Sequence, residues 1–432
     1  ARWLDKGMIK PVLRAADSFG FARSESWNAG AGDAPPVPDL RAQQSAEVSP
    51  EMVRLLDRAA AGRDLSEADI VRLFAAREQD LQAVLDAADS LRREIAGDTV
   101  TFVSNRNINY TNICLYHCTF CAFSKGGGAR DARGPAYKLD LAEVAKRSVE
   151  AWEAGATEVC LQGGIHPDYT GDTYLSIVRA VKDATPDMHV HAFSPLEITH
   201  GAETLGLSLE VYLRRLKEAG LSTLPGTAAE ILDDEIRDII CADKVNTDGW
   251  LAVMEAAHTV GLRSTATIMY GHVEQPKHWA RHLLRVRNLQ KRTGGFTEFV
   301  PLPFVHMEAP MWRQGLARSG PTFREAVLMH AVARLVLHPH IANIQTSWVK
   351  MGPEGAALCL QAGANDLGGT LMNESITRAA GGVNGQLLDE AAMTQLTSAI
   401  GRPLKQRTTL YGEPVLSKRR LDGSANDTAL HG

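Results

Sequence analysis

The most informative stretch of this chain is Asn107-Ile-Asn-Tyr-Thr-Asn-Ile-Cys114-Leu-Tyr-His-Cys118-Thr-Phe-Cys121, which holds three of the six cysteines directly after a strand-like run. Thiolates with this Cys-x3-Cys-x2-Cys spacing can converge on one metal centre, and soft sulfur ligands select zinc, copper(I) or iron–sulfur clusters. A closed structural site would require a fourth ligand. Three thiolates therefore predict a metal centre with one free position for a substrate or a cofactor.

From residue 99 onward, short apolar runs alternate with amphipathic helical patterns, which is typical of repeated βα units. The expected strands are 100–107, 158–162, 189–193, 222–224, 264–269, 296–300, 341–346 and 365–371, and the helical patterns include 141–154, 207–219, 248–260 and 276–292. Eight units in about 270 residues predict an α/β fold of the (β/α)8 TIM-barrel type. An open doubly wound sheet is the alternative. In a barrel, the cysteines follow the first strand at the carboxyl-terminal mouth, where such folds hold active sites.

The segments outside the barrel also have distinct patterns. Residues 1–48 include a Gly/Ala/Pro-rich stretch at 28–38, which predicts a linker or the remnant of a preceding domain. Residues 49–98 predict an N-terminal helical cap, with Pro50 at a first helical position and a capping box from Ser66 to Asp69. The barrel spans 99–400, and 401–432 form a closing segment and tail. Because the chain begins with Ala1, we expect a fragment of something longer.

Composition limits the partners. A net charge of −5 and a pI near 6.3 give no electrostatic reason to expect nucleic acid or an anionic membrane. No run approaches the roughly 20 apolar residues that span a bilayer, and no leader is recognisable, so we expect a cytoplasmic protein. Six cysteines in this length do not make a disulfide scaffold, and Cys160, Cys241 and Cys359 are expected to be small buried hydrophobes.

Several strand ends carry polar groups. His189 and His191 alternate with Val190 and are expected to point into the barrel, where proton transfer, substrate hydrogen bonding or a purely structural role are all open. Together with Glu298 in the sixth strand they are the candidate catalytic residues. The run from Val159 ends in the diglycine Gly163-Gly164, where a missing Cβ lets a ligand approach the backbone; a simple tight turn is the alternative.

Other features are open to two interpretations. Thr227 and Glu230 have the spacing of a capping box, which needs no ligand. Tyr270, Phe304 and Trp348 are candidate aromatic walls of a site, although each one taken singly is expected to be a core residue. The glycine-rich loop 124–135 lacks the ending of a phosphate-binding loop, so it is expected to be a lid or a surface loop.

The cysteine spacing, with Phe120 directly before the third cysteine, resembles the signature of the radical S-adenosylmethionine (SAM) superfamily. The resemblance implies that the three cysteines hold three irons of a 4Fe-4S cluster and that SAM chelates the fourth. The implied cofactor-binding residues are Phe120, Gln162, Gly163, Gly164 and Glu230. A glutamate commonly follows the diglycine in that superfamily, whereas this sequence has Ile165 and His166, so the resemblance supports only the backbone contact there.

The word N-I-N-Y-T-N-I-C resembles the group that makes deazaflavin and futalosine-pathway menaquinone precursors. The words H-V-H-A-F-S-P, T-G-G-F-T-E-F-V-P-L-P-F and A-N-D-L-G-G-T-L resemble the tyrosine-using half of Fo synthases. The resemblance implies that a SAM-derived radical takes a hydrogen from the amino group of L-tyrosine. The Cα–Cβ bond then breaks, and the 4-hydroxybenzyl group joins 5-amino-6-(D-ribitylamino)uracil. It also implies a second radical SAM half or subunit that cyclises the adduct, and an external electron donor.

Three alternatives remain open. Aminodeoxyfutalosine synthases of menaquinone biosynthesis share the cysteine word and the barrel. An iron–sulfur electron-transfer protein would hold the cluster without cleaving SAM. A zinc-stabilised binding module would use the three thiolates with His117 or a distant cysteine, although no second Cys/His pair has finger-like spacing.

Overall fold

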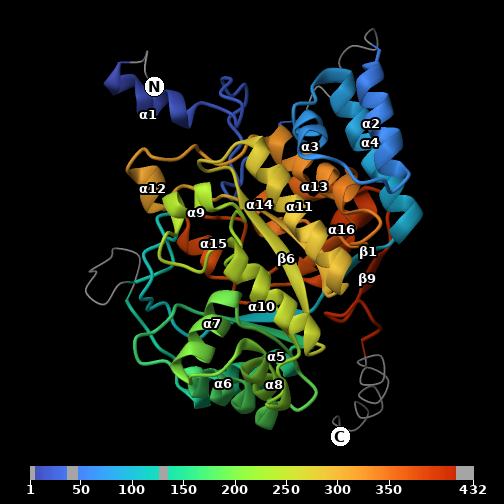
Figure 1. Cartoon of the computed structure of the whole chain (residues 1–432). Coiled ribbons are helices and arrows are strands. Elements are labelled where there is room, and N and C mark those ends of the chain that lie inside the picture. The colour runs from blue at the N-terminus through green and yellow to red at the C-terminus, as the bar shows by residue number, and fades with distance from the viewer. Residues whose placement is uncertain (1–4, 37–46, 126–134, 415–432) are drawn as a thin grey trace, which may run out of the picture.

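Six parallel strands follow one another in chain order across the larger sheet of the computed structural model, which describes residues 5–36, 47–125 and 135–414 (Figure 1). They are β2 (Asn105–Asn109), β3 (Glu158–Gln162), β4 (His189–Ala192), β5 (Thr223–Leu224), β6 (Arg263–Tyr270) and β7 (Phe296–Pro303). At least one helix lies between each strand and the next, as parallel pairing requires. The predicted alternation of strands and helices is confirmed.

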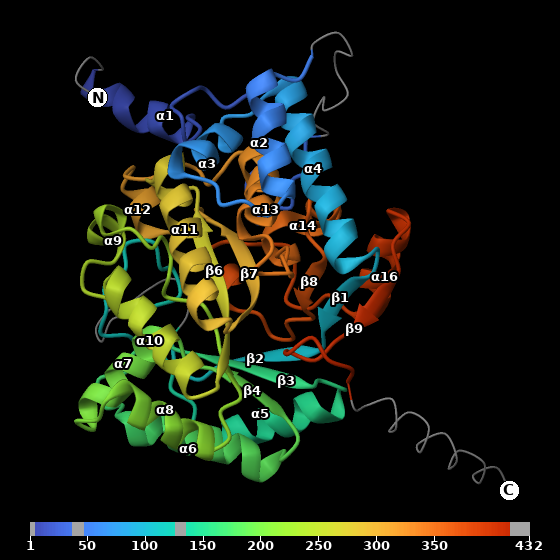
Figure 2. The same ribbon diagram turned by 45° about the vertical axis from the view of Figure 1, so that its right-hand side comes forward.

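A second sheet continues the curve of the first. In it, β1 (Val100–Val103) lies between β8 (Asp366–Gly369) and β9 (Leu404–Gln406). Isolated parallel bridges join the two sheets: Phe299 with Ile344, Gln345 with Asp366, and Arg106 with Met372. The strands therefore form a ring, which confirms the α/β barrel over the open doubly wound sheet (Figure 2).

Two predicted strands differ from the structure. The expected strand 100–107 is divided at Ser104, because β1 pairs with β8 and β9 whereas β2 pairs with β3. The expected strand 341–346 forms only bridges at Ile344 and Gln345. The amide of Ile344 donates to the side chain of Asn365 (2.9 Å), which takes the place of a ladder bond to a neighbouring strand.

Helices surround the barrel in the order expected of βα units. They are α5 (Leu141–Glu153), α6 (Gly171–Ala184), α7 (Pro195–Thr204), α8 (Leu209–Glu218), α9 (Asp234–Ile240), α10 (Thr247–Thr259), α11 (Pro276–Thr293), α12 (Pro310–Arg313), α13 (Phe323–Leu337), α14 (Trp348–Leu360), α15 (Ile376–Ala379) and α16 (Glu390–Ala399). The four helical patterns named from the sequence correspond to α5, α8, α10 and α11. Every residue of α13 except Arg324 is buried, because α4 covers its outer face.

Three N-terminal helices, α2 (Pro50–Ala60), α3 (Glu67–Phe74) and α4 (Glu78–Ala96), pack on α11 and α13 (Figure 2). The Ser66 side chain and Asp69 form the expected capping box, and Pro50 occupies the first turn of α2. Phe74 of α3 meets Trp279 of α11 edge to face at 5.0 Å between ring centroids. These helices therefore cover one side of the barrel, away from the cysteine loop.

The segment before these helices is also packed on the barrel where it is described. After α1 (Ile9–Arg14), Trp27 is buried against Phe323 at 5.1 Å between ring centroids. Arg23 donates to the carbonyls of residues 319–321. A linker or domain remnant over 1–48 stays a prediction, but Arg23 and Trp27 anchor its middle part.

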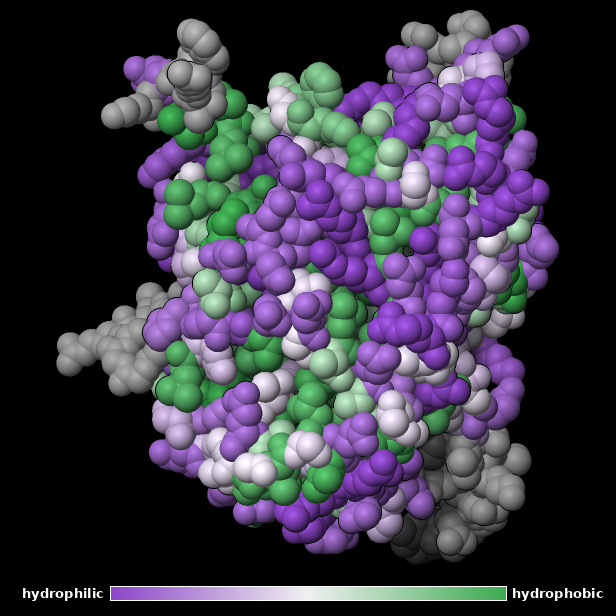
Figure 3. All heavy atoms as spheres, viewed as in Figure 1, coloured by the Kyte–Doolittle hydropathy of each residue, from purple (hydrophilic) through white to green (hydrophobic). Residues whose placement is uncertain are grey.

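Hydrophilic residues dominate the face shown in Figure 3, with hydrophobic residues interspersed among them. Within the described ranges, no helix combines the length and apolarity that crossing a membrane would require.

Candidate active site

The cysteine loop lines a cavity of about 260 Å³, here called the outer cavity, at the carboxyl ends of the strands. Hydrogen bonds from the loop backbone hold it there: Leu115 N donates to Ile165 O (2.8 Å) and Thr119 N to Ile240 O (2.9 Å). The three cysteines are free thiols and all contribute to the cavity wall. The mouth position predicted for the cysteines is thus where the structure places them.

The spacing of the three sulfur atoms fits a cluster better than a single ion. Tetrahedral zinc with bonds of about 2.3 Å holds its sulfur ligands about 3.8 Å apart. The sulfurs of Cys114, Cys118 and Cys121 do not all lie within 4.8 Å of one another, although they face one cavity. His117 is 87% exposed in its side chain and lies beside Asp243. The donor set is therefore suited to a wide, three-thiolate group such as a 4Fe-4S cluster.

A buried cation lies beside the thiols. Burial raises the pKa of Cys118 and Cys121. For Cys118, the positive charge of Lys244 is the largest effect that lowers the pKa. Lys244 Nζ is 2.8 Å from a carboxylate oxygen of Glu230 and 5.4 Å from the ring centroid of Phe120. Although burial alone would raise the pKa of Glu230, Lys244 holds it below its usual value. The outer cavity therefore contains an ionised pair next to the cysteine loop.

The capping box predicted at Thr227 and Glu230 is wrong. No helix begins there; α9 begins at Asp234 and is capped by Asp233. Glu230 instead has a left-handed backbone (φ 44°), and its side chain lines the outer cavity. Pairing with Lys244, fourteen residues later, outweighs the local cap because both groups are removed from bulk water.

The diglycine is required by close packing. A Cβ on Gly163 would lie 2.4 Å from the ring of Tyr110, and one on Gly164 would lie 2.2 Å from the carbonyl oxygen of Ile113. Gly164 N also donates to Thr111 O (2.9 Å). The missing side chains therefore let β3 touch the start of the cysteine loop, and both glycines and Gln162 line the outer cavity.

A second cavity of about 240 Å³, here called the inner cavity, occupies the middle of the barrel. It shares six lining residues with the outer cavity: Gln162, Thr227, Leu302, Lys350, Ile376 and Thr377. Its lining combines apolar surface with polar side chains, among them Cys160, His191 and Glu298. Cys160 is therefore not simply a buried hydrophobe, whereas Cys241 and Cys359 are buried as expected.

The two candidate histidines share one partner. His189 Nε2 and His191 Nδ1 lie 2.8 Å and 2.7 Å from the hydroxyl oxygen of Thr223. Burial lowers the pKa of both, to about 4 for His189, despite the nearby charge of Glu158. Only His191 lines the inner cavity, so the structure brings one of the pair to the site.

The third candidate, Glu298, belongs to a buried charge cluster at the floor of the inner cavity. Arg407, just after β9, donates to Asp366 at 2.5 and 2.8 Å and to Glu298 at 3.0 Å. Burial and the neighbouring Asp366 raise the pKa of Glu298 to about 7, and Arg407 offsets them only in part. One guanidinium therefore serves two carboxylates. The closing segment thus forms part of the site.

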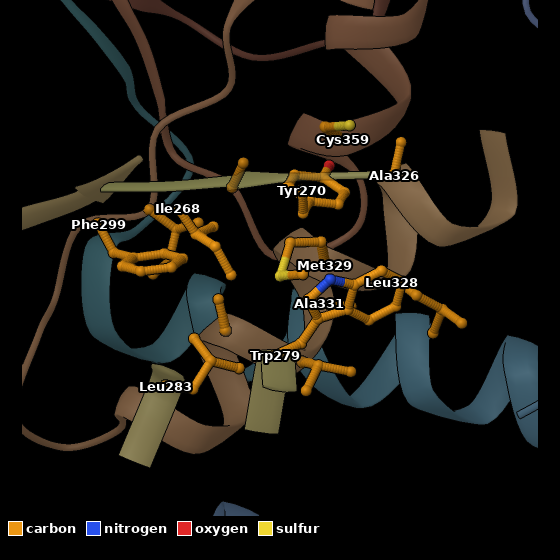
Figure 4. Close-up of a cluster of buried hydrophobic side chains, with 14 of the residues drawn as sticks. Ile268, Tyr270, Trp279, Leu283, Phe299, Ala326, Leu328, Met329, Ala331 and Cys359 are labelled. Atoms are coloured by element: carbon orange, nitrogen blue, oxygen red, sulfur yellow. The ribbon is translucent and has the colours of Figure 1, made fainter. Parts of the chain in front are cut away.

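Two of the expected aromatic walls are core residues. Tyr270 is fully buried and points away from the cavities toward Trp279 and Met329 (Figure 4). Trp348 is buried and donates from its indole nitrogen to Gly369 O (2.9 Å). Phe304 lines the outer cavity, as expected. The loop 124–135 lies largely outside the described residues.

Sequence reasoning missed five charged residues at the cavities: Glu158, Lys244, Lys350, Glu374 and Arg407. None lies in a motif with regular spacing, and each comes from a loop or element end where charged residues are usually solvated. The sequence therefore carries no signal that identifies them as site residues.

Comparisons with known proteins agree with this geometry. Residues 108–286 match the family model "Radical SAM superfamily", and residues 293–413 match "CofH/MqnC C-terminal region". The solved structure of a methylornithine synthase superposes with a TM-score of 0.64 at 19% identity, covering 81% of this chain and 97% of that one. At that identity the likeness concerns the fold alone. The barrel and its three-cysteine loop define a radical SAM enzyme.

Curated relatives narrow the family. The 5-amino-6-(D-ribitylamino)uracil–L-tyrosine 4-hydroxyphenyl transferase of Methanopyrus kandleri is 49% identical over 336 residues, which cover 78% of this chain and 90% of the relative. The FO synthases of Streptomyces coelicolor and Mycobacterium tuberculosis (H37Rv) are 51% and 52% identical, covering 85% and 83% of this chain. The chain spans about two fifths of the length of those synthases. It belongs to the family of the 4-hydroxyphenyl transferase.

Proposed function

We propose that this enzyme transfers the 4-hydroxybenzyl group of L-tyrosine to 5-amino-6-(D-ribitylamino)uracil in deazaflavin (Fo) coenzyme biosynthesis. The observation that carries the proposal is the 49% identity to the Methanopyrus kandleri transferase across 90% of its length. A three-thiolate loop beside two adjoining cavities in the barrel supports it. The aminodeoxyfutalosine synthase alternative has no observation of its own in its favour.

In this proposal Cys114, Cys118 and Cys121 hold a 4Fe-4S cluster and the outer cavity holds SAM. When bound, the cluster and SAM together would supply a 5′-deoxyadenosyl radical by one-electron cleavage of SAM. Gly163 and Gly164 line the outer cavity, and the methionine portion is placed against their backbone. The ionised Glu230–Lys244 pair offers both signs of charge at the same wall.

The inner cavity is where we place the two substrates. Its wall combines hydrogen-bonding side chains with buried charges, which suits a uracil with a polyol chain and a phenol. Arg407, held by Asp366, forms part of the wall of this cavity. The barrel thereby holds the reacting groups near one another and excludes water from them.

Two partners belong to the proposal. A second radical SAM half or subunit would cyclise the adduct, since the FO synthases matched by this chain are more than twice its aligned length. An external reductant would supply the electron. Neither nucleic acid nor a membrane is included, in keeping with the net charge of −5.

The deciding experiment is anaerobic incubation of the reconstituted enzyme with SAM, dithionite, L-tyrosine and the diaminouracil. We expect 5′-deoxyadenosine, methionine and a 4-hydroxybenzyl–uracil adduct by mass spectrometry. Cleavage of SAM without an adduct, or an adduct only with a chorismate-derived enol ether, would overturn the tyrosine assignment. Absence of SAM cleavage would favour an electron-transfer protein.

The cluster assignment is tested separately with Cys118→Ala. Losing one thiolate should abolish the brown iron–sulfur absorption and all SAM cleavage, because three ligands are needed to hold the cluster. Cys359→Ala is the matched control: its thiol is buried in the core beside Tyr270 (Figure 4). The control should retain its iron. Equal iron content in both variants would contradict the assignment.

A further inference from the structure

We propose that Lys350 and Glu374 form a clamp for the zwitterionic head group of an α-amino acid at the junction of the two cavities. Lys350 would bind the carboxylate and Glu374 the ammonium group. The clamp rests on the proposed function only in taking L-tyrosine as that amino acid. No sequence motif or family match assigns a role to either residue.

Lys350 is a cation without a counter-ion in contact. It is half-buried near the start of α14 and lines both cavities. Its ammonium nitrogen is 3.1 Å from the hydroxyl oxygen of Thr377, and within the described part of the chain no carboxylate lies within 4.0 Å of it. Burial lowers the pKa of Lys350, and the more distant charge of Glu374 opposes that shift. A buried ammonium group of this kind is stabilised by an anionic ligand.

Glu374 offers the complementary free acceptor. It lies in the segment between β8 and α15, is 4% exposed, and lines the inner cavity. One carboxylate oxygen accepts from Thr377 N (2.7 Å), but the other is buried without a hydrogen-bond partner. The side-chain oxygen of Asn107, on the neighbouring strand β2, is likewise buried and unpartnered and lines the same cavity. Two acceptors that lack donors predict a ligand group rich in N–H bonds.

Thr377 ties the two charges together. Its hydroxyl contacts Lys350 and its amide contacts Glu374, so opposite charges flank one residue yet do not form a direct ion pair. A ligand that carries an anionic and a cationic group on adjacent atoms can contact both charges at once. An α-amino acid has that arrangement, whereas the diaminouracil is neutral.

The clamp differs from the place proposed for the methionine portion of SAM. That portion belongs at the cysteine loop and the diglycine, and Glu374 does not line the outer cavity. A head group bound to Lys350 and Glu374 would place the amino acid at the junction between the outer cavity and the inner cavity.

The test uses trimmed ligands with reconstituted holoenzyme and SAM, without a reductant, so that binding is measured without turnover. Lys350→Met should lower the affinity for L-tyrosine by about ten- to a hundredfold. The affinity for tyramine, which lacks the carboxylate, should be unchanged. Glu374→Gln should weaken L-tyrosine and tyramine but not 3-(4-hydroxyphenyl)propionate, which lacks the amine. Equilibrium dialysis gives each affinity, and SAM affinity should stay constant in both variants.

Matched controls are Lys405→Met and Glu413→Gln, the same substitutions in an exposed ion pair (2.5 Å). They should bind every ligand like the wild type. Lys350→Arg keeps the charge and should recover part of the tyrosine affinity, which separates charge from folding; thermal melts check folding in each case.

Three outcomes are distinguishable. The clamp is overturned, and the proposed function stands, if the wild type binds L-tyrosine but Lys350→Met weakens the binding of tyrosine and of tyramine equally. The same holds if either variant weakens only the binding of the diaminouracil. If the wild type binds a different α-amino acid instead, and the two variants respond in the same way to its analogues without the carboxylate or the amine, tyrosine is overturned as the substrate and the clamp is supported. If it binds no α-amino acid, both are overturned.

Discussion

Gly164 shows how one missing methyl group decides the position of the cysteine loop. Its backbone lies against Ile113 and Cys114, where an added Cβ would approach to 2.2 and 2.9 Å. Both distances are shorter than real Cβ contacts, and the first is to backbone that cannot rotate away. The chain around the first cysteine therefore depends on glycine at this position.

Gly164→Ala should displace the loop, lower the iron content after reconstitution and cost about 1–3 kcal/mol of stability. Gly355→Ala is the control, because its added Cβ would meet side chains at 3.4 Å or more inside α14. That variant should be neutral or stabilised by up to about 1 kcal/mol. Iron analysis and urea unfolding measure both. Full iron loading of Gly164→Ala would contradict this view of the loop.

At the scale of elements, β9 lies beside β1, and the turn after it contributes Arg407 and Thr409 to the wall of the inner cavity. The strand pairs in parallel with β1, and Arg407 then enters the interior to neutralise Asp366 and Glu298. The ring of Tyr411 stacks on the guanidinium at 4.0 Å, and Thr409 donates to Glu158 at 2.5 Å. A short segment distant in sequence from the barrel strands thus completes their core.

Arg407→Met should destabilise the protein by about 3–5 kcal/mol, because it leaves buried carboxylates without a counter-charge. Lys405→Met, on the exposed side of the same strand, should stay within about 0.5 kcal/mol of the wild type. Chemical denaturation at neutral pH compares them. A loss no larger than that of Lys405→Met would show that the carboxylates are protonated or solvated.

For the whole molecule, the same cluster predicts a pH dependence of stability. Glu298 has a pKa of about 7 in the folded protein against a usual 4.5, because burial disfavours its charge. Between these values the folded state binds more protons than the unfolded state, so this contribution to the free energy of unfolding is complete below pH 4.5 and falls as pH rises toward 7.

Glu298→Gln should remove that slope, since glutamine does not titrate. Unfolding of wild type and variant is compared at several values between pH 4.5 and 7, and the difference between the two curves is the readout. Stability that rises relative to the variant over this range would mean that Arg407 dominates and that Glu298 is ionised in the folded state.

Local patterns were sufficient for much of the fold. The capping box at Ser66, the helices and most strands follow from periodicity and from caps within four residues, so they were predictable. Glu230 was misassigned by the same local rule, because its partner Lys244 is fourteen residues away. Tyr270 and Trp348 are core residues, as expected of each taken singly, and which of the candidates would line the cavity was not decided by the sequence, because a strand or helix residue can face either layer of a barrel and only packing selects one.

The sequence by itself indicated the class of enzyme and predicted the cysteine ligands, because the three thiols lie within eight residues of one another and keep that spacing however the rest of the chain folds. Only the tertiary structure decided what surrounds them. Lys350, Glu374 and Arg407 reach the cavities because segments more than 250 positions apart pair with one another: β1 with β8 and β9, and Arg106 of β2 with Met372. Burial then gives those charges their effect, since in water they would be screened.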